Sequence, residues 1–376
     1  MTQPPSGQVE NPRQTRRSAS IQRRLWANIT LATCATVIAL ALGEIAVRLL
    51  GLGVMPTILT QESLDVFTPS PIKGLNYELR PNFSGRAYGC EIKTNSHGMR
   101  GPERPIAKPD HVRRVLILGD SVAFGIGVEH SATFAALLEK DLSETTTAGW
   151  RVEVINASVP GYNSQQEYLA LREKGLAWQP DVVLAVAVIN DVEPAYELTA
   201  QGALSWENPP EIYREIAQRY LAGKGLSAIL RRNFRLYALI SRTWHNPYFL
   251  TRKYLAYLNE LYYADSPAWR RTSEALANMN AACRQRQIAF VLAYCPVPTQ
   301  PEPETMRRIR RLFGDFAARQ GITCLDLFDA QSSQRVEKIT ISMLDRHPNA
   351  LGHRLLADAL RPVLTRHLAR PINPSR

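Results

Sequence analysis

The sequence contains the residue types that acyl-transfer chemistry uses. They are a serine, a glycine, an asparagine, and a histidine close to an aspartate. The first position is Gly119-Asp120-Ser121, which directly follows the apolar run 114–118. A serine on a tight turn between a strand and a helix exposes its hydroxyl near the positive end of the helix, where developing negative charge is stabilised. The tripeptide also fits a simple helix cap. Ser121 is therefore a candidate nucleophile with a structural alternative.

Two further candidate positions follow the next apolar runs along the chain. Gly161 closes the segment 156–161 (NASVPG), and Asn190-Asp191 follows the run 181–188. A glycine lets its backbone N–H approach a ligand closely, as an oxyanion site requires, and the amide of Asn190 can supply a second donor. An ordinary turn glycine and a helix cap are the structural alternatives.

Asp345 and His347 stand two residues apart near the carboxyl end of the chain. A histidine in a loop beside a carboxylate can act as a base whose tautomer the acid holds. His353 is interpreted as a structural residue of the following helix. Because no third ligand clusters with these residues, the sequence predicts no metal site, and no cofactor is expected.

Short apolar runs alternate with amphipathic stretches through most of the chain. The runs 114–118, 152–155, 181–188, 288–293 and 323–327 read as strands, and 165–176, 272–286, 304–319 and 350–368 read as helices. Continuous apolar strands separated by helices predict an α/β fold with a five-stranded parallel sheet covered on both faces. Ligands of such sheets bind beyond the carboxyl ends of the strands, where the polar positions above should meet.

Taken together, these motifs resemble the four blocks of the SGNH hydrolases, the GDSL-type esterases and lipases. The resemblance covers residues 111–370, apart from an insertion at 192–271, and implies a flavodoxin-like three-layer α/β/α sandwich. It also implies Ser121 as nucleophile and His347 as base, with an oxyanion hole formed by Gly161, Asn190 and the Ser121 N–H. Gly119, Asp120 and Asp191 complete the motifs, and residues 77–101 look like the lead-in of bacterial membrane-anchored members.

The sequence departs from the family pattern at two positions. Val188 occupies the place of a glycine in the third block, which is not a donor. Leu344 stands where the family's acid usually lies, three residues before His347. Asp345 then becomes the candidate acid, in an Asp-x-His pair similar to that of membrane-associated relatives acting on polysaccharide acyl groups. A backbone carbonyl could also orient His347.

The amino end predicts a membrane anchor. Residues 1–24 are polar and basic and are expected to be a disordered cytoplasmic tail, whereas 25–50 are long and apolar enough to cross a bilayer as one helix. A cleaved signal peptide is the alternative, because Ala39-Leu40-Ala41 resembles a cleavage site. Arginines precede the apolar run, so the expected location is the inner membrane, with the tail in the cytoplasm and the catalytic domain outside it. Residues 51–110 are expected to form an extended juxtamembrane segment.

The charge of the chain argues against a nucleic-acid partner. The formal net charge is +11 over 376 residues. The tail contributes five arginines against Glu10, and the insertion contributes eleven basic and seven acidic residues, which are interspersed and form no basic stripe. The insertion is rich in tyrosine and tryptophan and is expected to be a lid or carbohydrate platform, or alternatively a helical appendage with an aromatic core. Five cysteines without a Cys-x-x-Cys pair indicate free thiols.

Three functions fit these observations. The first is an anchored serine esterase that removes acyl groups from an envelope glycan or lipid. The second is an O-acyltransferase that passes the acyl group to a cell-surface polysaccharide beside a membrane acyl-donor partner. The third is a catalytically silent binding module of the envelope, suggested by the displaced acid and the large insertion.

Overall fold

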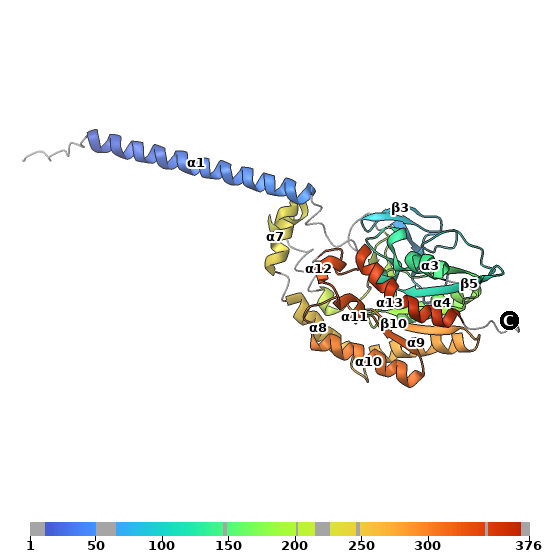
Figure 1. The fold of residues 1–376 in the computed structure, drawn as a ribbon. Coiled ribbons are helices and arrows are strands. Elements are labelled where there is room, and N and C mark those ends of the chain that lie inside the picture. The colour runs from blue at the N-terminus through green and yellow to red at the C-terminus, as the bar shows by residue number, and fades with distance from the viewer. Residues whose placement is uncertain are drawn as a thin grey trace, which may run out of the picture. The chain divides into compact units, whose positions relative to one another are not determined.

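The computed structural model describes residues 12–49, 65–145, 149–200, 202–214, 226–245, 249–342 and 345–369. The chain forms two compact units (Figure 1). One comprises Met1–Val54 with Ile216–Phe249, and the other comprises Met55–Glu215 with Leu250–Arg376. The second unit contains every candidate site residue.

The second unit is built on a five-stranded parallel sheet. Its strands lie in the order β11-β10-β7-β5-β6, so the first strand of the sheet in the chain pairs with both the second and the third. This is the flavodoxin-like order, and the predicted fold class is confirmed. The strands are β5 (Val112–Gly119), β6 (Arg151–Asn156), β7 (Val182–Ala187), β10 (Ala289–Tyr294) and β11 (Thr323–Asp326).

Helices cover both faces of this sheet. The helices α3 (Phe134–Thr145) and α13 (Ala350–Leu368) pack on one face. On the other face lie α4 (Ser164–Glu173), α9 (Pro267–Arg284) and α10 (Glu304–Gln320), the last two orange in Figure 1. Short elements connect them: η3 (His130–Ala132), η4 (Gly175–Trp178), α11 (Phe328–Ser332) and α12 (Val336–Ile339).

The interior strand β5 shows why its sequence is apolar without interruption. Val115 and Ile117 belong to the core on the α3 and α13 side, whereas Leu116 and Leu118 belong to the core on the α4 and α9 side. Successive side chains of a strand point to opposite faces, so a strand covered on both faces needs apolar residues at every position. Packing on both faces of the sheet therefore fixes the position of Gly119, where β5 ends.

Residues 65–110 form the part of the second unit that precedes the main sheet. They form two antiparallel pairs, β1 (Phe67–Pro69) with β2 (Tyr77–Leu79) and β3 (Ser84–Ala87) with β4 (Cys90–Lys93). Their buried side chains share a core cluster with Phe124. A small hairpin, β8 (Glu197–Leu198) with β9 (Leu204–Ser205), follows the third strand of the main sheet.

Arg100 ties this segment to the helix that carries the candidate serine, α2 (Ser121–Phe124). Its guanidinium, 2% exposed, donates to the carbonyl oxygens of Phe124 (3.0 Å), Gly125 (2.6 Å) and Val128 (2.6 Å). The last carbonyl groups of a helix lack intrahelical partners, and charge-assisted hydrogen bonds from Arg100 supply those of Phe124 and the C-cap Gly125, while a third holds the following turn at Val128. A residue of the segment before the sheet therefore stabilises the end of α2.

The first unit contains α1 (Pro12–Leu49), α6 (Leu226–Asn233) and α7 (Arg235–His245). Within α1, Arg23–Leu49 has a mean hydropathy of 1.9 and is the one described helix long and apolar enough to cross a membrane. The helix begins at Pro12, so residues 12–24 differ from the disordered tail expected from the sequence. Arg, Gln, Ser and Ala at these positions allow a helix to continue, and no proline or glycine interrupts it.

The insertion 192–271 does not form one appendage. Residues Ile216–Phe249 belong to the first unit, while the rest, including most of α8 (Phe249–Leu261), belongs to the second. Periodicity identifies such helices but not the surface on which each one packs.

Candidate active site

The structure brings Ser121, His347 and Asp345 into one hydrogen-bonded chain. Nε2 of His347 lies 2.8 Å from Oγ of Ser121, and Nδ1 of His347 lies 2.6 Å from Oδ1 of Asp345. The same carboxylate oxygen accepts the backbone N–H of His347 at 3.1 Å. Two contacts from one carboxylate hold the ring and its backbone in a fixed relation. This arrangement can hold a neutral imidazole with its Nε2 lone pair directed at the serine.

The surroundings of His347 alter its basicity. Burial alone would lower the pKa of the imidazole, but the hydrogen bond and the negative charge of Asp345, with the charge of Asp120, outweigh it. The net effect raises the pKa of His347 above its ordinary value. A stronger base takes a serine proton more readily, provided that the pH is high enough to keep the imidazole neutral.

Asp120 does more than cap a helix. Its Oδ1 accepts the N–H of Val122 at 2.9 Å, as the cap interpretation requires. Its Oδ2 accepts both the Ser121 hydroxyl at 3.0 Å and the Asn190 amide at 3.1 Å. Because Ser121 has a single hydroxyl hydrogen, it can donate to Asp120 or to His347, but not to both. Asp120 therefore holds the Asn190 amide beside the serine, a role that the sequence did not suggest.

Gly119 and Gly161 occupy places where a side chain would collide. Gly119 has φ +155°, and a Cβ there would lie 2.5 Å from Cβ of Ala123. Gly161 has φ +83°, and a Cβ would lie 2.8 Å from the Tyr77 hydroxyl and 3.0 Å from the Tyr196 ring. Both glycines are thus required by backbone conformation and by close approach.

The loop that carries Gly161 is held by residues of the segment before the sheet. The Tyr77 hydroxyl donates to the Pro160 carbonyl at 2.9 Å, and the Tyr162 hydroxyl donates to the Tyr77 carbonyl at 2.5 Å. The rings of Tyr77 and Tyr162 also meet edge to face. Sequence reasoning assigned no role to Tyr77, although it opens the segment 77–101 that resembles the lead-in of membrane-anchored members. The reciprocal tyrosine contacts fix the position of the Gly161 N–H.

Asp191 is a buried residue next to Asn190 in the chain. It is 2% exposed and accepts the Ser164 hydroxyl at 2.8 Å and the Val188 N–H at 3.3 Å. Burial, together with the charge of Asp120, raises the pKa of this carboxyl well above its ordinary value. Its contacts anchor the loop after β7, which carries Asn190. Asp191 is therefore a support of the site.

An aromatic cluster surrounds a buried carboxyl group next to this loop. Glu193 is 4% exposed and accepts the Tyr213 hydroxyl at 2.8 Å and the Tyr254 hydroxyl at 3.3 Å. The cluster also contains Trp206, which stacks on Tyr196 with ring centroids 4.2 Å apart. Since Tyr196 lies against Gly161, the aromatic residues of the insertion reach the loop that carries Gly161. The tyrosine-rich composition was the only signal of this cluster in the sequence.

We expect Glu193→Gln to weaken the pH dependence of stability. Burial raises the pKa of Glu193 to about 7, although the two tyrosine hydroxyls lower it. A carboxyl group with a raised folded-state pKa stabilises the fold fully below its unfolded pKa, and this contribution is lost as the pH rises through 7. The loss amounts to at most about 3 kcal/mol. Melting temperatures at pH 5 and pH 8 should therefore differ less in Glu193→Gln than in the wild type.

The matched control for this substitution is Glu211→Gln, because Glu211 is exposed. It should keep the wild-type difference in melting temperature between the two pH values. An equal difference in Glu193→Gln and the wild type would contradict the assignment of a buried, protonated Glu193.

His353 is buried and structural. Its Nδ1 accepts the Phe134 N–H at 3.2 Å, and burial lowers its pKa to about 3. Among the described residues, no group of His, Cys, Asp and Glu side chains is arranged to hold a metal ion. All five cysteines are free thiols.

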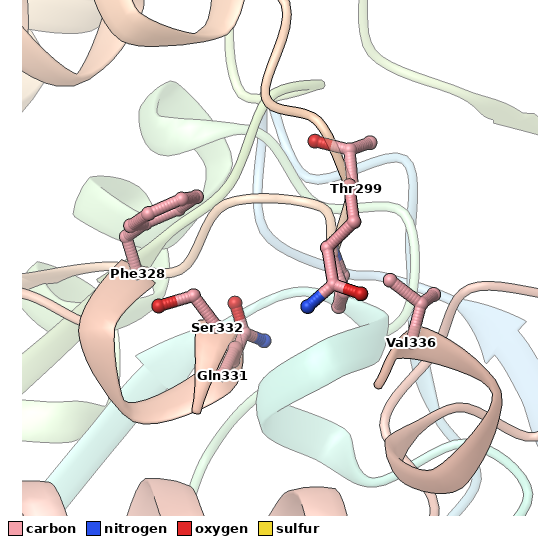
Figure 2. Close-up of a pocket in the computed structure, with 7 residues that line it drawn as sticks. Thr299, Phe328, Gln331, Ser332 and Val336 are labelled. Carbon is pink, nitrogen blue, oxygen red and sulfur yellow. The ribbon is translucent and has the colours of Figure 1, made fainter. Parts of the chain in front are cut away.

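A small cavity lies beside α11 (Figure 2). Its volume of about 10 Å³ corresponds to a single water molecule. Thr299 Oγ1 and Gln331 Oε1 have no hydrogen-bond partner within the described part of the chain, and both can bind such a water. Phe328, Ser332 and Val336 complete the labelled wall. The cavity is too small to accept an acyl chain.

Solved structures similar to this chain share low sequence identity with it. TesA is 18% identical, with a TM-score of 0.40, covering 68% of this chain and 99% of its own. LAE5, an alpha/beta hydrolase enzyme from the metagenome of Lake Arreo, Spain, is 18% identical, with a TM-score of 0.40 and coverages of 69% and 97%. Axe2, an acetylxylan esterase from Geobacillus stearothermophilus, is 15% identical, with a TM-score of 0.40 and coverages of 70% and 97%.

No curated protein matches the chain by sequence. The profile of the GDSL-like lipase/acylhydrolase family, however, matches residues 117–355. This range contains the serine motif at its start and the Asp345–His347 pair near its end, and it covers more than half of the chain. The resemblance to the SGNH and GDSL-type enzymes is thereby confirmed, and this chain belongs to the GDSL-like lipase/acylhydrolase family of ester-hydrolysing enzymes.

Proposed function

We propose that this chain is a membrane-anchored serine esterase that hydrolyses acyl esters of an envelope glycan or lipid. The observation that carries the proposal is the hydrogen-bonded chain from Ser121 through His347 to Asp345. Family membership supplies the class of reaction, and the apolar helix Arg23–Leu49 supplies the anchor. Arginines ahead of this helix favour an extracytoplasmic catalytic unit.

The first step forms an acyl-enzyme. His347 Nε2 takes the hydroxyl proton of Ser121, and Oγ forms a bond to the ester carbonyl carbon. The carbonyl oxygen becomes an oxyanion that accepts hydrogen bonds from the N–H groups of Ser121 and Gly161 and from the Asn190 amide. The bond to the alcohol then breaks, and the alcohol leaves with the proton from His347.

The second step regenerates the enzyme. A water gives its proton to His347 Nε2 and attacks the acyl carbon, and the carboxylic acid leaves as Ser121 Oγ takes the proton back. Throughout both steps Asp345 keeps the proton on Nδ1 and stabilises the imidazolium. Asp120 keeps the Asn190 amide in place through its Oδ2.

A labelled acyl donor tests hydrolysis against transfer. The full-length protein in detergent should release the label from an acylated sugar as free carboxylic acid, even when a large excess of an unlabelled sugar is present. Label found on hydroxyl groups of the added sugar would contradict hydrolysis and favour an O-acyltransferase. A failure to release label from any member of an ester panel would contradict both.

The proposed orientation is tested separately from the chemistry. A carboxy-terminal tag should be degraded by protease added to intact spheroplasts, because the catalytic unit is expected outside the cytoplasm. A tag that stays protected until the membrane is broken would reverse the orientation and leave the esterase assignment untouched.

A further inference from the structure

The anchor helix carries a charged pair close to its carboxyl end, Glu44 and Arg48. Charged side chains in or near the hydrocarbon layer are costly and usually have partners. Glu44 Oε1 accepts the Arg48 Nε hydrogen at 2.7 Å. The same carboxylate also accepts the backbone N–H groups of Arg235 at 2.9 Å and Leu236 at 2.7 Å. A residue of α1 therefore caps the amino end of α7.

Arg48 completes the contact on the preceding helix. Its guanidinium donates to the Asn233 carbonyl at 3.0 Å, at the carboxyl end of α6. Helix ends leave backbone N–H and C=O groups without intrahelical partners, and these groups need partners most where water is scarce. The Glu44–Arg48 pair thus satisfies both helix ends that meet at Phe234.

The packing between α1 and α7 is also close. A Cβ on Gly43 would lie 2.9 Å from Cδ2 of Leu236, so the absence of a side chain at Gly43 lets the two helices approach. Figure 1 shows α7 beside the carboxyl end of α1. Glu44 and Arg48, four residues apart, lie on one face of α1, and Gly43 stands next to Glu44 in the chain. The contact is therefore a specific docking of α7 on the anchor.

The docked helices expose large apolar side chains. Leu226 is 71% exposed and Ile229 58% exposed, and their spacing of three residues places them on one face of α6. Phe234, between α6 and α7, is 47% exposed. On the neighbouring part of α1, Ile45 and Leu49 are 52% and 82% exposed. Large apolar side chains are therefore exposed on α6 and at its junction with α7, as well as on the anchor.

We propose that α6 and α7 form an interfacial hairpin, lying in the surface of the bilayer that α1 crosses, with Leu226, Ile229 and Phe234 inserted among the lipid acyl chains. Amphipathic helices bind membranes in this way, with an apolar face buried at the boundary between headgroups and acyl chains. A lipid surface is favoured as the occupant because the Glu44–Arg48 contact fixes the hairpin at the end of a membrane-spanning helix. The inference rests on the proposed anchoring by α1.

The interfacial hairpin changes how the catalytic unit is held. The chain passes from one unit to the other at three points, after Val54, Glu215 and Phe249. A simple signal anchor would leave one covalent connection between the membrane and the enzyme. In this protein the insertion that follows Asn190 also reaches the membrane, through α6 and α7, and the chain then returns to the catalytic unit. The bilayer then restrains the same insertion whose aromatic residues contact the oxyanion loop.

Fluorescence quenching in liposomes tests the proposal on the full chain. Ile229→Cys and Phe234→Cys are labelled one at a time with an environment-sensitive dye, in a background in which Cys34 and Cys324 are replaced by serine. We expect acyl-chain nitroxide lipids to quench both labels at least threefold more strongly than a label at Lys140→Cys, an exposed position on α3. A label at Val37→Cys, within α1, reports on anchoring itself.

The outcomes separate the two claims. If the Val37 label is not quenched, the anchor proposal fails, and this inference fails with it. If the Val37 label is quenched while the Ile229 and Phe234 labels behave like the Lys140 label, the hairpin does not lie in the membrane and only this inference is overturned. Labels shielded from both nitroxide lipid and aqueous iodide would indicate a protein partner and would also overturn it.

The docking by Glu44 is tested with a graded pair of variants. Glu44→Ala removes both acceptor oxygens, whereas Glu44→Gln keeps one. Amide hydrogen exchange in a peptide covering 235–245 should rise at least tenfold in Glu44→Ala and less in Glu44→Gln. Exchange in β5 and ester turnover should stay at wild-type levels. Equal exchange across wild type and both variants would show that Glu44 does not hold α7.

Discussion

Ser121→Ala is expected to lower kcat for p-nitrophenyl acetate by about 10⁴-fold or more, because it removes the only oxygen that can form the acyl-enzyme. It should also abolish labelling of the folded protein by a fluorophosphonate probe. The Oγ that is lost lies 2.8 Å from His347 Nε2 and 3.0 Å from Asp120 Oδ2. Progress curves on ester substrate and mass spectrometry of the labelled peptide measure the two effects.

Ser158→Ala is the matched control for this variant. Ser158 is fully buried near the Gly161 loop, and its hydroxyl has no hydrogen-bond partner among the described residues. Removing it should leave turnover within about twofold of the wild type, since no reacting group depends on it. If folded Ser121→Ala hydrolysed esters near the wild-type rate, Ser121 would not be the nucleophile.

Asp345→Asn is expected to lower kcat about 10²- to 10⁴-fold and to move the acid limb of the pH profile to lower pH. His347 must be neutral to accept a proton, so activity rises as the pH passes its pKa. Asp345 raises that pKa through its hydrogen bond and its charge. Removing the charge lowers the pKa, and the imidazole then stays neutral to lower pH. The pH dependence of kcat/KM measures the shift.

Asp329→Asn provides the comparison, because Asp329 is an exposed carboxylate on α11. Its profile should superimpose on that of the wild type. An unmoved acid limb in Asp345→Asn, with kcat near the wild-type value, would mean that another group, such as a backbone carbonyl, orients His347. The hypothesis of a displaced acid would then be wrong.

The parts of this molecule that follow a local pattern could be read from the sequence. Unbroken apolar strands between amphipathic helices predicted the five-stranded parallel sheet, and the sheet brings Ser121, Asn190 and His347 to the carboxyl ends of its strands. The resemblance to the family motifs pointed to Gly161, and Asp345 became the candidate acid because it lies two residues before His347, one position away from the usual family spacing. In each of these cases the signal lies within a few residues of the element that it describes.

The contacts that could not be predicted join segments far apart in the chain. Tyr77 supports Pro160 from 83 residues away, and Asp120 holds Asn190 from 70 residues away. Neither contact leaves a periodic trace, because hydrogen-bonding geometry depends on how the packed elements meet. Glu44 is an intermediate case. Glu44 stands inside an apolar run, and only the fold identifies the amino end of α7 as its partner.

The hydrogen bonds of Arg100 set a limit on where the catalytic part of the chain can be cut. The family profile begins at residue 117, yet Arg100 supplies three donors to the turn that ends the serine-bearing helix. A fragment starting at His111 would contain every candidate site residue but would lack these donors and the Tyr77 support. A catalytic fragment that keeps these contacts must therefore begin before Tyr77, well upstream of the family profile.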